Sequence, residues 1–275
     1  MIAVLGSTGT IGTQVAVGLA QRGAPARALL RSPERAQSPL AAVRADLRDA
    51  ASLRRAMDGA DQLFLLTPHG PAQDLAEAAA IDAAVSAGVR RIVKVSGGAP
   101  SLGPNGASST AVAHWRSEQR IEAAGLRFCF LRSSYLMQNV ASLETKAGLL
   151  AAPMGRAPIA MVDARDVAEC AVTALLLDEA PAQAWHLTGP AGVTFAEVAR
   201  LRGARYVDVP PRLAARALRR RGASPFDVDH ALRMAAYFAS GADGAPTDAV
   251  RRLTGRPPRS FADFLSDHPQ RKAAR

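Results

Sequence analysis

Lysine, cysteine and long apolar runs are all scarce in this chain of 275 residues. The two cysteines, Cys129 and Cys170, lie in apolar periodic stretches, where a thiol is usually a small buried hydrophobe, so we expect no disulfide and no redox role. No apolar run reaches the roughly 18 residues of a membrane span, and no basic leader precedes the first apolar residues. We therefore expect no membrane span, no signal peptide and a cytoplasmic location.

Positive charge is abundant, but it comes almost entirely from arginine. The net charge is +10, yet the chain contains only three lysines, Lys94, Lys146 and Lys272. The densest basic run, residues 216–221, falls in a predicted amphipathic helix and is typical of a solvated face. Since clustered cations are what nucleic-acid binding requires, we expect no nucleic-acid partner.

Apolar segments of strand length alternate with helix-period segments over the first two thirds of the chain. The predicted strands are Ile2–Leu5, Ala26–Leu30, Ala41–Ala45, Leu63–Leu66, Arg91–Val95 and Arg127–Leu131. The predicted helices are Gly12–Arg22, Ala50–Asp58, Pro71–Ala87 and Ser108–Ala124, and each ends at a glycine, at positions 23, 59, 88 and 125. Apolar strands joined by helices predict an α/β fold with a doubly wound parallel sheet of the Rossmann type.

The regular alternation of predicted strands and helices ends after Arg132. We predict a helix over 135–150, a loop over 153–158, a helix over 164–177 and a strand over 184–187, followed by mostly helical, proline-interrupted chain. This pattern divides the molecule into a Rossmann core, residues 1–132, and a small, mostly helical substrate-side lobe, residues 133–275. Residues 160–190 are expected to return to the core.

A glycine-rich loop follows the first strand and opens the first helix. Its predicted cofactor-binding residues are Gly6, Thr8, Gly9, Thr10, Ile11 and Gly12. Such a loop lets backbone N–H groups approach a pyrophosphate at the positive end of a helix, and a side chain at Gly6 or Gly9 would obstruct that approach. An ordinary strand-to-helix turn is the alternative, but the position at the first strand of a βαβ series favours dinucleotide binding.

The end of the second predicted strand suggests which dinucleotide binds. A site specific for NAD places an acidic residue there, whereas this chain has Arg31, with Arg35 close behind. A guanidinium pairs well with a 2′-phosphate, so we expect NADP(H), although Arg31 is alternatively a plain surface arginine. Asp46 and Leu47 follow the third strand, where they are expected to contact adenine unless Asp46 only caps the next helix.

Together these motifs resemble the atypical short-chain dehydrogenases, specifically the NmrA-like group of NAD(P)-binding proteins. The resemblance continues in His-Trp-Arg-Ser-Glu at 114–118, Leu-Met-Gln-Asn at 136–139, Asp-Ala-Arg-Asp-Val-Ala at 163–168 and Leu-Thr-Gly-Arg-Pro-Pro at 253–258. It therefore extends over nearly the whole chain. It implies a dinucleotide-binding fold and supports the adenine role of Asp46.

One departure from short-chain dehydrogenases concerns catalysis. Their Tyr-x-x-x-Lys motif supplies a tyrosine proton donor, but here Thr110 and His114 stand at the two positions and the motif occurs nowhere. A threonine hydroxyl is too weak an acid to replace tyrosine. His114, with an ordinary pKa near 6.5, is therefore the candidate proton donor, and a mere hydrogen bond to the nicotinamide ribose is the alternative.

Other candidate residues follow the fourth and fifth strands, at the edge where open sheets bind ligands. Cofactor contacts are expected from Thr67, Pro68, His69, Ser96 and Gly97. His69 is otherwise a solvated loop residue, and Ser96, near the family's catalytic serine, otherwise only ends its strand. The expected substrate contacts are His69, Tyr135, Met137, Asn139, Tyr237 and Phe238.

Two main functions fit this sequence. The first is an NADPH-dependent reductase of a small quinone, enone or imine, whose activated centre accepts hydride without a tyrosine acid. The second is a non-catalytic NADP(H)-binding sensor that regulates a partner protein, and a redox-silent isomerase or cyclase is a third. We expect a small-molecule substrate, no metal ion, and a monomer or homodimer.

Overall fold

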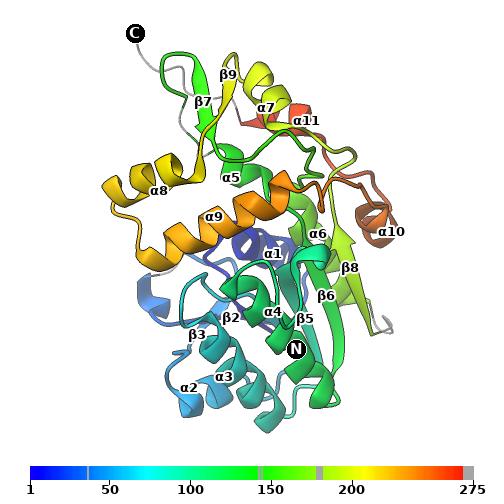
Figure 1. Cartoon of the computed structure of the whole chain (residues 1–275). Coiled ribbons are helices and arrows are strands. Elements are labelled where there is room, and N and C mark those ends of the chain that lie inside the picture. The colour runs from blue at the N-terminus through cyan, green and yellow to red at the C-terminus, as the bar shows by residue number, and fades with distance from the viewer. Residues whose placement is uncertain (36, 142, 144, 178–181, 269–275) are drawn as a thin grey trace.

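The computed structural model describes residues 1–275 except 36, 142, 144, 178–181 and 269–275. A seven-stranded sheet, parallel throughout, has the order β3-β2-β1-β4-β5-β6-β8 (Figure 1). The strands are β1 Ile2–Leu5, β2 Ala26–Leu30, β3 Ala41–Arg44, β4 Gln62–Leu65, β5 Arg91–Gly97, β6 Arg127–Ser133 and β8 Gln183–Leu187. The doubly wound sheet is thus confirmed, and its order reverses between β1 and β4.

Helices cover both faces of this sheet. On one face α1 (Thr10–Gln21) packs against α6 (Ala164–Leu176), which in turn contacts α10 (Ala249–Thr254). The other face carries α2 Ala50–Ala56, α3 Gln73–Ser86 and α4 Ser109–Ala123, while the short 3₁₀ turns are η1 Pro33–Arg35 and η2 Ala99–Ser101. All four glycines predicted to stop helices adopt the left-handed conformation, with φ from 62° to 78°.

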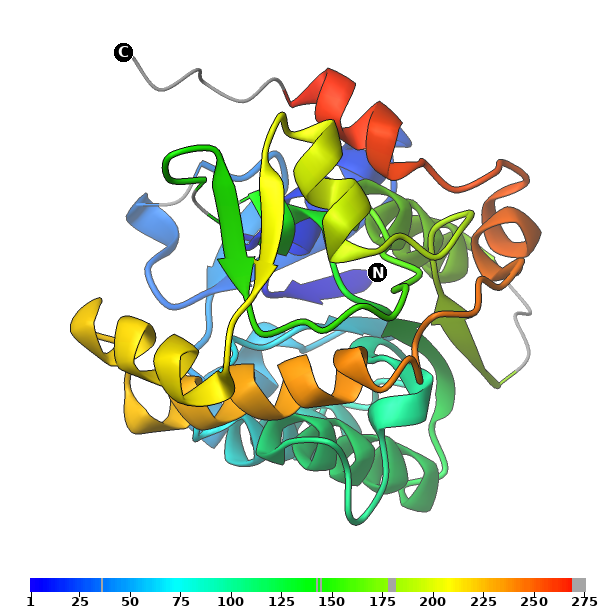
Figure 2. The same cartoon turned by 45° about the horizontal axis from the view of Figure 1, so that its top comes forward.

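The C-terminal lobe lies over the carboxyl edge of the sheet (Figures 1 and 2). It comprises α5 Met137–Ala141, β7 Leu149–Ala152, α7 Phe195–Leu201, β9 Arg205–Asp208, α8 Pro211–Arg220, α9 Pro225–Ala239 and α11 Phe261–Asp267. The predicted helix over 135–150 is wrong beyond α5. The turn at Gly148, with φ of 72°, leads into β7, which alternates exposed and buried residues and pairs in parallel with β9.

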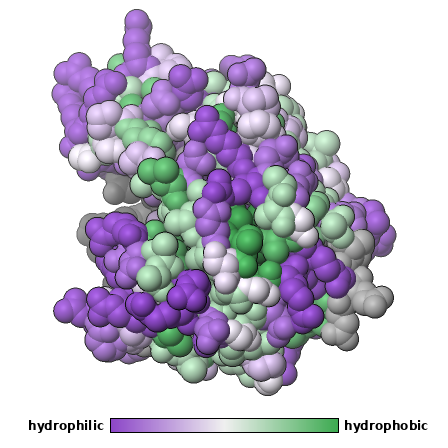
Figure 3. All heavy atoms as spheres, turned by 90° about the horizontal axis from the view of Figure 1, so that it is seen from below, coloured by the Kyte–Doolittle hydropathy of each residue, from purple (hydrophilic) through white to green (hydrophobic). Residues whose placement is uncertain are grey.

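The structure also describes the character of the surface and the state of the two thiols. Figure 3 shows mostly hydrophilic side chains on the face seen from below, around a limited apolar area. In the part of the chain that the structure describes, no helix combines the length and the apolar character that membrane crossing requires. Cys129 and Cys170 are both free and buried, and burial raises the pKa of Cys129 to about 11, which makes it inert.

Candidate functional site

The glycine loop between β1 and α1 contains glycines of two kinds. A Cβ at Gly6, whose φ is +86°, would lie 2.2 Å from the carbonyl oxygen of Leu66, and one at Gly12 would lie 2.0 Å from the carbonyl oxygen of Gly6. Internal packing therefore requires both glycines, so at Gly6 a side chain is excluded by the protein itself, whatever the space a ligand needs. A Cβ at Gly9 would meet only an ordinary contact of 3.7 Å, and Gly9 has no positive φ.

The first turn of α1 is open to an anion. Gly9 is the N-cap and provides no side-chain cap, and the exposed residues Thr8, Gly9 and Thr10 surround this helix end. No acidic residue occupies the first turn. Backbone N–H groups at such an end, together with the helix dipole, attract negative charge. The loop therefore fits a pyrophosphate, with Gly9 as the position that keeps it accessible.

The ends of β2 and β3 bring together the residues predicted to select the cofactor. Arg31 is exposed, as is Arg35 in η1. Hydrogen bonds from Arg48 lower the pKa of Asp46, and the nearby charge of Arg31 adds to this effect. The proposal that Asp46 caps α2 is wrong, because the side chain of Asp49 accepts the capping bond from the Ser52 N–H at 3.0 Å.

A cleft of about 500 Å³ lies at the carboxyl ends of β4, β5 and β6, between the start of α1 and helix α9. It collects these predicted residues: Ile11, Thr67, His69, Ser96, Gly97, His114, Tyr135, Asn139, Tyr237 and Phe238. Two hydroxyls of this group, on Ser96 and Tyr237, are buried and have no hydrogen-bond partner within the described residues. Unpartnered hydroxyls are costly unless a ligand or water satisfies them, so this cleft fits a polar ligand.

His69 connects the loop after β4 to helices on the other side of the cleft. Its Nδ1 lies 3.2 Å from the Thr110 hydroxyl, and its Nε2 lies 3.5 Å from Asp227 at the start of α9. Its ring also packs 4.4 Å from that of His230. His69 is therefore positioned by protein contacts at the rim, while its neighbour Pro68 is exposed and lies outside the residues that line the cleft.

Beneath the cleft lies a buried polar network. The Lys94 ammonium contacts a Glu77 carboxylate oxygen at 2.7 Å and the Nδ1 atom of His114 at 3.2 Å. Glu77 also accepts hydrogen bonds from Thr67, at 3.0 Å, and from Ser117. Burial raises the pKa of Glu77, but Lys94 and the hydrogen bonds outweigh burial and lower it to about 2. Glu77 is therefore ionised at neutral pH.

His114 lies between this network and the cleft. Burial, followed by the charge of Lys94, lowers the pKa of His114 to about 3 even though Glu77 acts in the opposite direction. The ring is consequently neutral at pH 7. This corrects the expectation of an imidazolium with a pKa near 6.5, because the neutral ring can donate a hydrogen bond but is no reservoir of an acidic proton.

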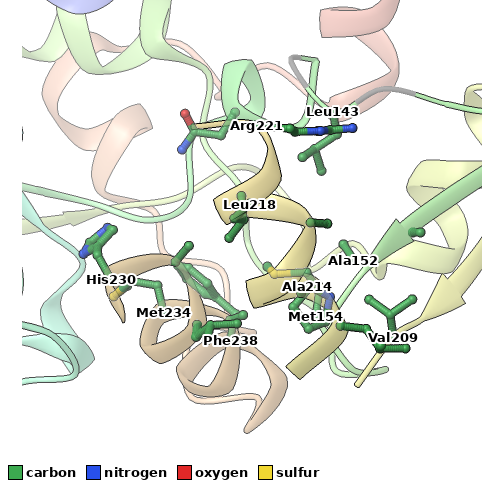
Figure 4. Close-up of a pocket in the computed structure, with 18 of the residues that line it drawn as sticks. Leu143, Ala152, Met154, Val209, Ala214, Leu218, Arg221, His230, Met234 and Phe238 are labelled. Atoms are coloured by element: carbon green, nitrogen blue, oxygen red, sulfur yellow. The ribbon is translucent and has the colours of Figure 1, made fainter. Parts of the chain in front are cut away.

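A second, apolar cavity of about 590 Å³ adjoins the cleft. Figure 4 shows its lining, with Ala214 and Leu218 of α8 and Met234 and Phe238 of α9 around a common space. Both spaces share the residues Tyr135, Asn139, His230, Met234 and Phe238. The shared lining makes the apolar cavity a continuation of the polar cleft.

The structure corrects one predicted substrate contact. Met137 is 1% exposed and packs in the hydrophobic core of the C-terminal lobe, outside the residues that line either space. Tyr135, before α5, and Asn139, within α5, both line the cleft, whereas Met137 at the start of α5 is buried in the core. Burial raises the pKa of Tyr135 to about 12, so it stays protonated and supplies no tyrosinate.

Sequence reasoning missed most of the buried network. Lys94 interrupts the otherwise apolar strand segment Ile-Val-Lys-Val in a chain with three lysines, and Gln73 and Glu77 lie one helical turn apart in α3. A lone lysine in a central strand was the available signal, because such a charge must find a buried partner. His230 and Met234, one turn apart on α9, gave no signal beyond helical spacing.

Comparison with known proteins identifies the family to which the chain belongs. The sequence model of the NmrA-like family matches residues 1–214. This chain belongs to the NmrA-like family. The expected resemblance is thereby confirmed, and the match spans both the glycine loop and the network beneath the cleft.

Individual relatives of this NmrA-like chain are similar along its whole length. It is 33% identical to an "NAD(P)H azoreductase" of Xenophilus azovorans, over 98% of each chain. It is 34% identical to a "(4-alkanoyl-5-oxo-2,5-dihydrofuran-3-yl)methyl phosphate reductase" of Streptomyces griseus, again over 98% of each. The fold is similar to that of an NADPH-dependent quinone oxidoreductase of Escherichia coli solved with NADPH, with a TM-score of 0.88 and 23% identity over 98% and 99% of the two chains.

Proposed function

We propose that this protein is an NADPH-dependent reductase of a small, largely apolar electrophile such as a quinone, an enone or an imine. The observation that carries the proposal is the apolar cavity opening into a polar cleft at the carboxyl edge of the sheet. That edge, at the reversal of strand order, is where doubly wound sheets bind ligands. The names of the two curated relatives, both reductases, support the reaction class.

The cofactor would extend across the reversal of the sheet. The N–H groups at the start of α1 would hold its pyrophosphate, with Gly9 leaving the approach open. Arg31 and Arg35 would pair with a 2′-phosphate beyond β2, and Asp46 would contact the adenine. On the other side, Thr67, Ser96 and Gly97 would lie beside the nicotinamide half in the cleft.

A bound NADPH supplies a hydride to the electrophile. The apolar walls from α8 and α9 would hold a flat substrate against the cleft and exclude water from its body. The neutral His114 ring would donate a hydrogen bond toward the charge that develops on the substrate, while solvent supplies the net proton. With the hydride from NADPH and the net proton from solvent, the reaction requires no Tyr-x-x-x-Lys pair.

The test is to incubate the protein with NADPH and each member of a panel of quinones, enones and imines. NADPH consumption is monitored by absorbance, and the products are identified. Gly9→Val, which blocks the pyrophosphate position, is the matched control. Turnover by the wild type and none by the control is the expected result. Tight NADPH binding without turnover of any panel member would contradict the reductase and favour the NADP(H)-binding sensor. Conversion of a substrate without NADPH consumption would favour an isomerase or cyclase.

A further inference from the structure

The pair Lys94–Glu77 occupies the floor beneath the cleft. Lys94, in the middle of β5, has no exposed surface, and the side chain of Glu77, in α3, is 1% exposed. A buried pair of this kind commonly stabilises a fold no better than well-packed apolar residues would. Its presence directly behind His114 therefore calls for an explanation other than stability.

We propose that the Lys94–Glu77 pair holds His114 as the neutral tautomer with its proton on Nε2, so that the ring presents a fixed N–H donor to the cleft. Lys94 is then a positioning residue that acts through His114. The tautomer follows from contacts alone, and its part in turnover rests on the proposed reductase function.

The number of donors on Lys94 decides the tautomer. An ammonium has three N–H donors and no acceptor. Its Nζ atom lies 2.7 Å from Glu77 Oε2, 3.4 Å from the carbonyl oxygen of Val95 and 3.2 Å from His114 Nδ1. Because an ammonium can only donate, the contact with His114 is favourable only when Nδ1 accepts. Glu77 Oε1 lies 3.7 Å from Nδ1, too far for Nδ1 to donate a hydrogen bond to it. The proton of the neutral ring must then lie on Nε2.

The neighbouring Gln73 leaves this assignment unchanged. Its amide nitrogen lies 3.3 Å from Nδ1 and 3.2 Å from Nε2 of His114, nearly equidistant from the two. The same nitrogen lies 3.4 Å from a Glu77 oxygen, which fixes it as the donor end of the amide. As a donor, Gln73 suits an accepting nitrogen at either position, and the ammonium of Lys94, the stronger donor because it is charged, decides that Nδ1 is the acceptor.

Four titratable groups face the His114 ring: Lys94 of β5, Glu77 of α3, His69 after β4 and His230 of α9. Burial and the charge of Lys94 lower the pKa of His114 most, Glu77 opposes them, and His69 and His230 lower it further. The ring therefore stays neutral throughout the range from pH 5 to 8, where the single tautomer set by Lys94 persists.

The ring is open to the cleft on the side away from the pair. His114 lines the cleft and its side chain is 15% exposed, while its Nδ1 edge faces the fully buried Lys94. Gly97, at the end of β5, permits this approach, because a Cβ there would lie 3.3 Å from the ring's Cδ2. Since Nδ1 is taken by Lys94, Nε2 is the ring nitrogen left for a substrate, beside the Gln73 amide nitrogen at 3.2 Å.

Nitrogen-15 NMR of the histidine rings in the full-length protein tests the assignment directly. The chain has five histidines, and His114→Gln identifies the His114 signals by their loss. We expect a protonated Nε2 and an unprotonated Nδ1, unchanged between pH 5 and 8. A ring protonated on Nδ1, or carrying both protons at pH 7, would overturn the proposal.

Variants of Lys94 provide a second test of the tautomer proposal. Lys94→Met leaves Glu77 beside the ring, so the proton should move to Nδ1 or the His114 pKa should rise by about 1 to 3 units. Lys94→Met with Glu77→Gln removes both charges and retains the volume, so it serves if the single variant fails to fold. An unchanged tautomer and unchanged pKa in a folded variant would also refute the proposal.

A matched control removes another ion pair of helix α3. Arg116 of α4 contacts Asp74 of α3 at 2.8 Å, and both side chains are more than a third exposed. Arg116→Met with Asp74→Asn should leave the His114 signals unchanged.

The charge-free Lys94 and Glu77 variant should lower kcat about 10- to 100-fold and change the Kd for NADPH only a few-fold, as loss of an orienting partner does. Absence of turnover in the wild type would defeat the reductase proposal and leave the NMR result to decide the tautomer.

Discussion

Two glycines of the same loop should respond to substitution in opposite ways. At Gly9 a side chain meets only a contact of 3.7 Å inside the protein, but it occupies the approach to the end of α1. Gly9→Val should therefore abolish dinucleotide binding while the fold survives. The stability cost should be about 1 kcal/mol or less, because valine is a poorer N-cap than glycine.

At Gly12 the conflict is internal. A Cβ there would lie 2.0 Å from the backbone oxygen of Gly6, which cannot swing aside as a flexible side chain would. Gly12→Ala gains roughly 0.5–1 kcal/mol of helix propensity but incurs about 1–3 kcal/mol or more of overpacking. We expect a net loss of stability and a Tm that is several degrees lower.

Calorimetric titration with NADPH beside thermal unfolding separates these two effects. Gly9→Val should lose binding and keep nearly the wild-type Tm, whereas Gly12→Ala should lose Tm. Retained NADPH binding by Gly9→Val would refute the assignment of the loop to the pyrophosphate. A wild-type Tm in Gly12→Ala would refute the packing argument.

Four further predictions follow from the same geometry. Arg31→Ala should weaken NADPH binding by about 1–3 kcal/mol and leave NADH binding unchanged, and equal losses in titrations of both cofactors would contradict the 2′-phosphate role. His114→Phe should keep the Kd for NADPH within a few-fold and lower kcat about 10²- to 10³-fold, so wild-type kinetics would remove the ring from catalysis. The His114 pKa is about 3 in the fold against 6.5 in the unfolded chain, so stability is present above pH 6.5 and is lost as pH falls toward 3. Urea unfolding should show a loss of about 2–3 kcal/mol from pH 7 to 4.5 that His114→Gln lacks, and an equal loss in that variant would count against the buried neutral ring. Ala214→Trp should fill the apolar cavity, raising KM for bulky substrates about tenfold with NADPH affinity unchanged, and an unchanged KM would place the substrate elsewhere.

The parallel sheet and the glycine loop were predictable because local patterns specify them. Apolar strand segments, helix periodicity and left-handed glycine stops each act within a few neighbouring residues. The helix expected over 135–150 failed because β7 depends on a partner, β9, whose residues lie more than fifty positions later. Strand pairing across such a distance has no local signature.

Some residues of the candidate site were likewise predictable from the sequence, and others were not. Thr67, Ser96 and His114 were predictable because the ends of parallel strands and the family motif place them at one edge. The role of Lys94 was hidden, since its partner Glu77 comes from another helix and their meeting is a product of packing. The pKa of His114 was wrong for the same reason: a pKa depends on burial and neighbouring charge, which only the folded structure reveals.

Hydride transfer itself is the central claim, and NADPH carrying deuterium at both C4 positions tests it most directly, whichever face of the nicotinamide the enzyme uses. With an enone from the panel, the deuterium delivered to carbon stays in the product and is counted by mass spectrometry. We expect one deuterium per product molecule with the wild type and none with Gly9→Val, whose pyrophosphate position is blocked. A reduced product without deuterium, or binding of NADPH with no product from any substrate, would contradict the account.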